Sequence, residues 1–327
     1  MSPQRRRPGG SPLPSLLDFE SSLRHLEHEL ENVRGRGSNG SSSEQQERLQ
    51  AELENQLRGI YASLTAWQKV QVSRHRERPY ALDYLQLGFS DFVELHGDRS
   101  FADDRAIIGG PAVLDSRTVM VIGQQKGRDT RENVERNFGM PHPEGYRKAE
   151  RLMKQAERLG IPVVTLIDIP GASASLQDEE RGQSEAIASS ISTMLALNVP
   201  TVAVVIGEGG SGGALAIACA DRLYMLEYAT FTVASPEAAA AILWRDAVKA
   251  PEAAQNMKIT ADDLMEMGFA DGIIPEPIGG AHRDRSAAAK SVTELATRAL
   301  NELDSLPREE LLARRYEKYR DIDFFRE

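Results

Sequence analysis

A glycine-rich segment at residues 207–214 constrains this chain more than any other feature of its sequence. It follows the apolar run 200–206, which is typical of a buried strand, and it leads into small apolar residues that are typical of a helix. Glycine lets a backbone approach another group closely, because a Cβ would block that approach. The first N–H groups of a helix attract negative charge. The segment therefore predicts a cradle of backbone amides that stabilises an anionic oxygen.

Two other interpretations apply to the same residues. The dinucleotide-binding pattern G-x-G-x-x-G runs from Gly207 to Gly212, with Glu227 in the place of the ribose-binding acid. Only a short helix fits before the strand expected at 222–226, and a dinucleotide site normally lies in the first βαβ unit of a chain. Dinucleotide binding is therefore disfavoured. A tight packing turn between a strand and a helix stays open as the structural alternative.

The pattern G-x-S-x-G of a nucleophile elbow is also present, with Ser211 at its centre. A serine nucleophile needs a histidine base that a carboxylate orients. The histidine that follows Ser211 in the chain is His282, which stands in a Gly-Gly-Ala-His-Arg loop. Nothing in the sequence connects these two residues, so hydrolysis is a weaker interpretation than an amide cradle.

A second glycine turn occurs at residues 167–172, where Gly171 and Ala172 follow an apolar strand and precede a helix. Two such turns at the ends of neighbouring strands would face one cleft. This pairing, more than either turn alone, favours a site between backbone amides, with Gly171 and Ala172 against the substrate.

The N-terminal region predicts helices without chemistry. Residues 1–15 are rich in Pro, Gly, Ser and Arg and predict a disordered start. Two apolar stripes at helical spacing follow, joined by a flexible connector at 35–43. The stripes consist of Leu16, Phe19, Leu23, Leu26, Leu30 and Val33, and of Leu49, Leu53, Leu57, Ile60, Leu64 and Trp67. We expect an antiparallel helical hairpin at residues 16–75 that docks a partner.

The rest of the chain predicts an α/β domain at residues 76–303 and a C-terminal helical tail at 304–327. Strands are expected at 111–114, 118–122, 161–168, 200–206, 222–226, 230–234 and 270–274. Helices are expected at 145–159, 179–197, from Pro236 onward, at 260–267 and at 286–303. Strands come in close pairs between helices, so the repeating unit resembles ββα.

Composition excludes several classes of protein. The chain has 327 residues and a formal net charge of -10, which disfavours nucleic-acid binding because phosphates attract positive fields. No apolar run approaches the roughly 20 residues that span a bilayer. The start carries Arg5, Arg6 and Arg7 without an apolar run after them, so it does not predict a secretory signal, and an organelle transit peptide is a minor alternative. The lone Cys219 predicts a buried, inert thiol and no Cys-cluster metal site. We expect a cytoplasmic protein with no membrane contact.

An ordered series of motifs resembles the carboxyltransferase alpha subunits of bacterial-type multisubunit acetyl-CoA carboxylases, from about Leu17 to the C-terminus. The motifs stand at residues 78–84, 94–99, 103–110, 125–128, 136–141, 143–148, 179–187, 206–215, 235–237, 242–244, 274–277 and 279–283. Each motif is modest by itself, whereas the series at family-like spacing is specific.

This resemblance implies a crotonase-like spiral of ββα units and a homologous beta subunit that carries a zinc ribbon, so that no metal is expected in this chain. It implies an alpha2-beta2 assembly that works with a biotin carboxyl carrier protein and a biotin carboxylase. The implied reaction transfers the carboxyl group from carboxybiotin on the carrier to acetyl-CoA. The product is malonyl-CoA, the committed precursor of fatty acid biosynthesis.

The resemblance also implies roles for residues of the glycine segment. The amides of Gly213 and Ala214 are expected to bind the ureido oxygen of biotin, while Gly209, Gly210 and Gly212 shape the turn. Lys126 and Arg128 are candidates for binding CoA phosphates, with solvated surface cations as the alternative. Glu208 and Glu237 are expected to form structural hydrogen bonds rather than to act as general bases.

One departure from the family pattern lies after Asp168. Family members usually have Thr at the position of Ile169 and Tyr at the position of Ser173. The loss of the aromatic side chain removes a packing surface near the expected biotin pocket. It predicts altered affinity, a compensating aromatic elsewhere, or a diverged paralogue.

Two further functions stay open from the sequence. A scaffold subunit would organise the complex without chemistry, so that its rate would not depend on Gly213 or Ala214. An independent crotonase-type hydratase or thioesterase would turn over acyl-CoA as an isolated chain.

Overall fold

The computed structural model describes residues 15–35 and 40–322, in two units that divide between Ser63 and Leu64. The predicted disordered start and the last residues of the predicted tail lie almost wholly outside the described residues. Within the described part of the chain, no helix is long and apolar enough to cross a membrane.

The first unit contains the predicted pair of helices, α1 (Arg24–Gly35) and α2 (Gly40–Tyr61), which pack on each other after a short 3-10 turn, η1 (Asp18–Leu23). Helix α2 begins at Gly40, so part of the predicted connector is helical. The apolar stripes face inward, with Leu30 and Leu57 buried. A buried carboxylate, Glu20, accepts a hydrogen bond from the Tyr61 hydroxyl at 3.1 Å, which joins the two ends of this unit.

The two units of the structure divide between Ser63 and Leu64, earlier than residue 75, where the hairpin was predicted to end. Helix α2 ends at Tyr61, and Thr65 caps a new helix, α3 (Ala66–Ser73), by accepting from the Gln68 N–H. The sequence stripe continued through this break because Trp67 falls at helical spacing from Leu57 and Leu64. Helix α3 belongs to the second unit.

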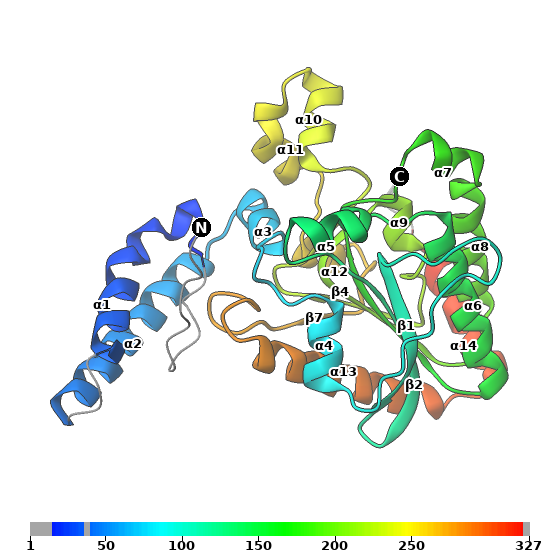
Figure 1. Cartoon of the computed structure of the whole chain (residues 1–327), viewed down its shortest axis with the longest axis horizontal. Coiled ribbons are helices and arrows are strands. Elements are labelled where there is room, and N and C mark those ends of the chain that lie inside the picture. Colours follow the sequence, from blue (N-terminus) through cyan, green and yellow to red (C-terminus); the bar gives the residue numbers. More distant parts are fainter. Residues whose placement is uncertain (1–14, 36–39, 323–327) are drawn as a thin grey trace. The chain divides into compact units, whose positions relative to one another are not determined.

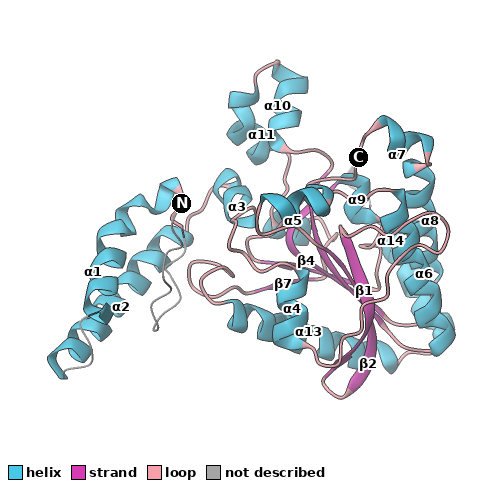
Figure 2. Ribbon diagram, in the orientation of Figure 1, coloured by secondary structure: helices cyan, strands magenta, loops and turns pink. Residues whose placement is uncertain are grey.

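The second unit is built around one sheet, whose strand order among the described residues is β1-β2-β3-β4-β5-β7, with β6 beside β4. Figure 2 shows the strands in magenta, between helices. The strands are β1 (Ile107–Leu114), β2 (Arg117–Gln124), β3 (Val163–Ile169), β4 (Thr201–Gly210), β5 (Arg222–Leu226), β6 (Thr230–Thr232) and β7 (Gly272–Ile274). The predicted hairpin of β1 and β2 is antiparallel, and β2, β3, β4 and β5 run parallel. The close pair β5 and β6 forms no hairpin, because β6 pairs with the end of β4.

Helices cover both faces of this sheet. Helices α6 (Pro143–Leu159) and α8 (Gln183–Ala196) pack together on one side, and α4 (Ala81–Gly88) and α13 (Arg285–Asp304) on the other. Every residue of β3 is buried, which is typical of a parallel strand with helices on both faces. The remaining helices are α5 (Thr130–Glu135), α7 (Leu176–Glu180), α9 (Ser211–Leu215), α10 (Pro236–Trp244), α11 (Ala250–Asn256), α12 (Ala261–Glu266) and α14 (Arg308–Arg320).

The helix predicted at 179–197 is two helices. Gly182 has a φ of 81° between α7 and α8, a left-handed conformation that ends the first helix and starts the second. Residues 177–185 are polar apart from Gly182, and a single glycine does not by itself end a helical pattern, which is why the sequence predicted a single helix.

The predicted C-terminal tail is part of the core as far as it is described. Arg315 of α14 is buried against Asp221, with guanidinium-to-carboxylate distances of 2.7 Å, and donates to the carbonyls of Leu197 and Val199. Leu311 lies in the main apolar core. Helix α14 therefore packs against the core of the second unit rather than extending from it.

Candidate functional site

The two glycine turns meet, as their pairing in the sequence predicted. Strands β3 and β4 are parallel neighbours, and their register places Ile169 beside Gly209, so both turns leave the same edge of the sheet. A Cβ at Gly210 would lie 2.3 Å from the Pro170 carbonyl oxygen, and a Cβ at Gly213 would lie 2.9 Å from the Ala172 nitrogen. The sequence-predicted residues of both turns therefore form one continuous surface of backbone.

Close packing explains most of the glycines in this segment. A Cβ at Gly209 would lie 2.3 Å from the Phe231 ring, and Gly213 would also collide with the Tyr146 hydroxyl at 2.7 Å. Gly212 differs, because its Cβ would meet only a methyl group of Ile187, at an ordinary 3.6 Å. The packing-turn interpretation thus accounts for Gly209, Gly210 and Gly213, whereas Gly212 faces open space.

The left-handed residue of the segment is a serine rather than a glycine. Ser211 has a φ of 56° and is exposed, a conformation that resembles a nucleophile elbow. However, His282 stacks on His75 with ring centroids 3.9 Å apart, and neither of its ring nitrogens hydrogen-bonds to any described residue. Burial, followed by the charges of His75 and Arg283, lowers the pKa of His282 to about 2. It is not a base for Ser211, so the geometry does not support a hydrolase.

Backbone donors without an acceptor in their own helix line the start of α9. In a helix whose N-cap is Gly210, the N–H groups of Ser211, Gly212 and Gly213 have no acceptor within the helix. The N–H of Ala214 is the first that can reach one, at the Gly210 carbonyl. Gly213 and Ala214 are buried, so a hydrogen bond from this turn to a bound anion would form away from bulk water.

A network of ion pairs fixes the start of the glycine-rich segment. Lys126, which follows β2, places its ammonium 2.6 Å from Asp168 of β3 and 3.0 Å from Glu208 of β4. Arg74 lies 2.6 Å from Glu208 and 2.6 Å from Glu237 at the start of α10. Burial alone would lower the pKa of Lys126, but the charges of Asp168 and Glu208 outweigh it and raise that pKa. These ion pairs agree with the expected structural role of Glu208 and Glu237, which stays a prediction.

A second buried ion pair supports the strand that precedes the glycine segment. The guanidinium of Arg78 lies 2.5 Å from Glu276 and donates to the Ile206 carbonyl at 2.7 Å. Both side chains are almost fully buried. The carbonyl just before Gly207 is therefore fixed from outside the sheet.

Comparisons with known proteins agree with this geometry. The family profile described as "Acetyl co-enzyme A carboxylase carboxyltransferase-like" matches residues 16–323. The acetyl-coenzyme A carboxylase carboxyl transferase subunit alpha of Methylococcus capsulatus is 55% identical over 304 residues, which are 92% of this chain and 95% of that protein. The corresponding subunit of Geobacter metallireducens is 51% identical over 312 residues, 95% and 98% of the two chains. The chain belongs to this carboxyltransferase family.

Solved structures confirm the fold. Transcarboxylase 12S matches with a TM-score of 0.51 at 22% identity, over 66% of this chain and 41% of that chain, so this chain spans less than half of the transcarboxylase chain. A Pseudomonas malonate decarboxylase hetero-tetramer in complex with coenzyme A matches with a TM-score of 0.55 at 19% identity, over 65% and 85% of the two chains. The predicted crotonase-like α/β fold and the predicted family are both correct.

Lys126 and Arg128, the sequence-predicted phosphate ligands of this carboxyltransferase chain, both have partners within it. Arg128 donates to the carbonyls of Arg76 and Arg78 at 2.9 Å, pairs with Asp83 and lies 3.8 Å over the Tyr80 ring. Lys126 is only 14% exposed, so the alternative of a solvated surface cation is wrong for it. Lys126 therefore pairs with residues at both glycine turns, and Arg128 binds the segment at 76–83.

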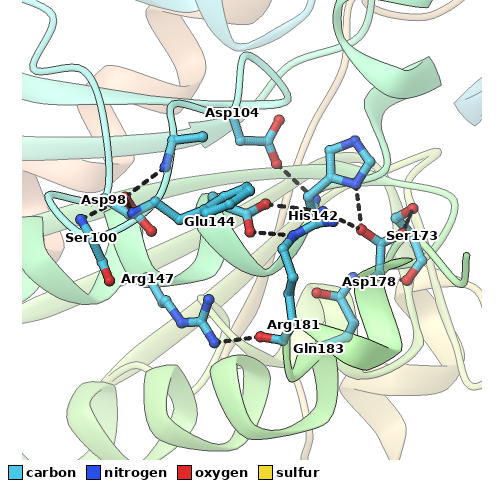
Figure 3. Close-up of polar contacts among 12 residues, drawn as sticks. Asp98, Ser100, Asp104, His142, Glu144, Arg147, Ser173, Asp178, Arg181 and Gln183 are labelled. Carbon is cyan, nitrogen blue, oxygen red and sulfur yellow. Dashed lines mark hydrogen bonds and ion pairs between the residues drawn. The ribbon is translucent and has the colours of Figure 1, made fainter. Parts of the chain in front are cut away.

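Ser173, where the resemblance implied a tyrosine, belongs to a polar cluster. Figure 3 shows Ser173, His142 and Arg181 around Asp178. The Ser173 hydroxyl donates to one carboxylate oxygen of Asp178 at 2.5 Å, and the other oxygen lies 2.6 Å from Nδ1 of His142 and 3.0 Å from Arg181. Burial would raise the pKa of Asp178, but hydrogen bonds from Ser173, Ser175 and His142 outweigh it and hold that pKa well below its usual range.

Sequence reasoning missed several residues of the site. Gln124 ends β2 and donates its side-chain amide to the Gly213 carbonyl at 2.8 Å. The sequence signal that could have found Gln124 is its position as a polar residue at the carboxyl end of an apolar strand. Asp178 could have been recognised as the third residue after Ser175, the spacing of a capping box. Tyr146 lies within the family motif at 143–148, but nothing in the sequence indicated that its hydroxyl faces the glycine segment.

Proposed function

We propose that this chain is the alpha half of a two-subunit active site that transfers a carboxyl group from carboxybiotin to acetyl-CoA. The partner would be a zinc-ribbon beta subunit, in an alpha2-beta2 assembly, and biotin would arrive on a carrier protein that a biotin carboxylase has charged. The family and the carboxyl transferase relatives support the reaction class. Malonyl-CoA would be the product, used in fatty acid synthesis.

The observation that carries the proposal is the meeting of the two glycine turns at one sheet edge, where the N–H donors of Gly212 and Gly213 have no acceptor within α9. In the reaction the N–C bond of carboxybiotin breaks and a C–C bond forms at the methyl carbon of acetyl-CoA. The methyl proton ends on the biotin nitrogen. Negative charge develops on the ureido oxygen and on the thioester oxygen, so amide donors stabilise the transition state without a side-chain base.

The finer assignments are part of the same proposal. The amides of Gly213 and Ala214 would bind the ureido oxygen, with the Ala214 N–H shared between that oxygen and the Gly210 carbonyl. Gly212 would lie beside them, and Gly209 and Gly210 would shape the turn. Gly171 and Ala172 would form the opposite wall. Lys126 and Arg128 would position the segment instead of binding phosphate, because their charges are already paired within the chain. The phosphates of CoA would then lie mainly against the beta subunit.

Reconstitution tests this proposal. The purified chain is mixed with a zinc-ribbon beta subunit, and malonyl-CoA formation from acetyl-CoA and carboxybiotin is measured. The chain alone should be inert and the mixture active. Hydration or thiol release by the isolated chain would instead support an independent acyl-CoA enzyme. An active complex whose rate ignores substitutions in the glycine segment would support a scaffold.

A further inference from the structure

A buried tyrosine hydroxyl faces the glycine segment without a partner. Tyr146 of α6 is 0% exposed, and its hydroxyl has no hydrogen-bond partner among the described residues. That hydroxyl lies 2.7 Å from the position that a Cβ of Gly213 would occupy. It therefore points at the first turn of α9, where the N–H of Gly213 also lacks an acceptor within the helix.

The position of this ring is fixed by its surroundings. Helix α6 begins with Pro143 at its first turn, and the Tyr146 ring packs with Ala186 and Ala216 and against Ala172 and Ile187. The carbonyl of Gly213 is held in turn by the side-chain amide of Gln124 at 2.8 Å. The other polar atom of Gln124, its Oε1, is also buried and unpaired. Tyr146 and Gln124 thus place two unpaired polar atoms around one glycine.

An unpaired buried hydroxyl is costly to a fold. Leaving such a group without a partner costs about 1–3 kcal/mol, and phenylalanine would fill nearly the same volume without that cost. The hydroxyl is a donor whose hydrogen rotates to suit an acceptor. Burial, and then the charge of Asp104, raises the pKa of Tyr146 well above its usual range, so the hydroxyl keeps its proton at neutral pH. Folding of the chain gives this donor no acceptor, whereas an anionic ligand oxygen at Gly213 would.

We propose that the Tyr146 hydroxyl is a third donor to the anionic oxygen bound at the first turn of α9, beside the amides of Gly213 and Ala214. This inference rests on the proposed function and adds a side chain to a cradle otherwise made of backbone. It makes Tyr146 a catalytic residue and Gln124 a positioning residue that orients the Gly213 peptide.

Tyr146→Phe in the reconstituted complex with the beta subunit tests the inference. Tyr84→Phe is the matched control, because Tyr84 is equally buried on α4 and its hydroxyl is also unpaired among the described residues. We expect Tyr146→Phe to lower kcat about 100-fold, the usual effect of removing one donor from an oxyanion site. Its Tm should equal or exceed that of the wild type, and Tyr84→Phe should keep wild-type kcat and a similar or higher Tm.

Each other outcome has a definite meaning. A wild-type complex without carboxyl transfer contradicts the proposed function itself. An active wild-type complex with an equally active Tyr146→Phe overturns only the inference. A lower Tm in Tyr146→Phe but not in Tyr84→Phe would show that the hydroxyl has a structural partner, which also overturns it.

Discussion

The ammonium of Lys126 lies 2.6 Å from the carboxylate of Asp168, and the same carboxylate accepts the N–H of Glu208 at 3.0 Å. One cation and one carboxylate thereby tie the end of β2 to the ends of β3 and β4, where both glycine turns begin. A residue that the sequence suggested as a phosphate ligand is thus placed to hold the site in shape.

Replacing Lys126 with methionine should destabilise the fold. The change leaves Asp168 and Glu208 close together without their shared cation, and breaking a buried pair in this way costs about 3–5 kcal/mol. Chemical denaturation of the isolated chain measures it. Lys154→Met is the control, because Lys154 is 57% exposed in a helical pair with Glu150 and should change stability by less than about 0.5 kcal/mol. Unchanged stability in Lys126→Met, with only a higher KM for acetyl-CoA, would restore the phosphate-binding interpretation.

Two adjacent arginines of α14 should behave very differently. Arg315 is fully buried against Asp221, whereas Arg314 is 55% exposed in a pair with Glu310. Arg315→Met leaves the Asp221 carboxylate buried without its cation, so we expect a loss of about 3–5 kcal/mol, against less than about 0.5 kcal/mol for Arg314→Met. Urea denaturation followed by circular dichroism gives both values. If Arg315→Met lost as little stability as Arg314→Met, α14 would be a tail that the fold does not need.

The buried His282 should make the fold sensitive to acid. Its pKa is about 2 in the folded chain, against the ordinary value of 6.5. Between these pH values the unfolded chain binds a proton that the folded chain does not, so stability falls as pH falls, by up to about 1.4 kcal/mol per pH unit. His282→Phe, which keeps a ring against His75, should remove this slope between pH 7 and pH 5. His25→Gln, at an 80% exposed side chain, should leave it unchanged. If the stability of His282→Phe still fell with pH as steeply as that of the wild type, a group other than His282 would cause the acid sensitivity.

The fold and family could be predicted because they depend on local patterns. Apolar runs gave β3 and β4, the motif series gave the family, and the two glycine turns gave the place of the site. The break at Tyr61 was missed because the apolar periodicity runs through it. The break at Gly182 was missed because one glycine among polar residues does not by itself mark a helix end. Only capping at Thr65 and the left-handed φ of Gly182 end those helices.

The partners of charged residues could not be predicted, because they depend on contacts across the fold. Lys126 and Arg128 are near each other in sequence, yet Lys126 binds two strands while Arg128 binds the segment at 76–83. Arg315 and Asp221 are 94 residues apart. The role of each glycine could not be predicted from the sequence either, because close packing and the close approach of a ligand both require glycine.

Gly212 separates those two requirements, and its substitution tests the amide cradle most directly. A Cβ there meets only Ile187 at 3.6 Å, so Gly212→Ala and Gly212→Val should fold, whereas the same changes at Gly213 would collide with Tyr146 and Ala172. The measurement is the carboxyl transfer rate of the reconstituted complex, with Tm recorded for each variant. If the cradle receives the ligand oxygen, the rate should fall for alanine and by more than about 100-fold for valine, with Tm little changed. A Gly212→Val complex that transfers carboxyl groups at the wild-type rate would contradict the account.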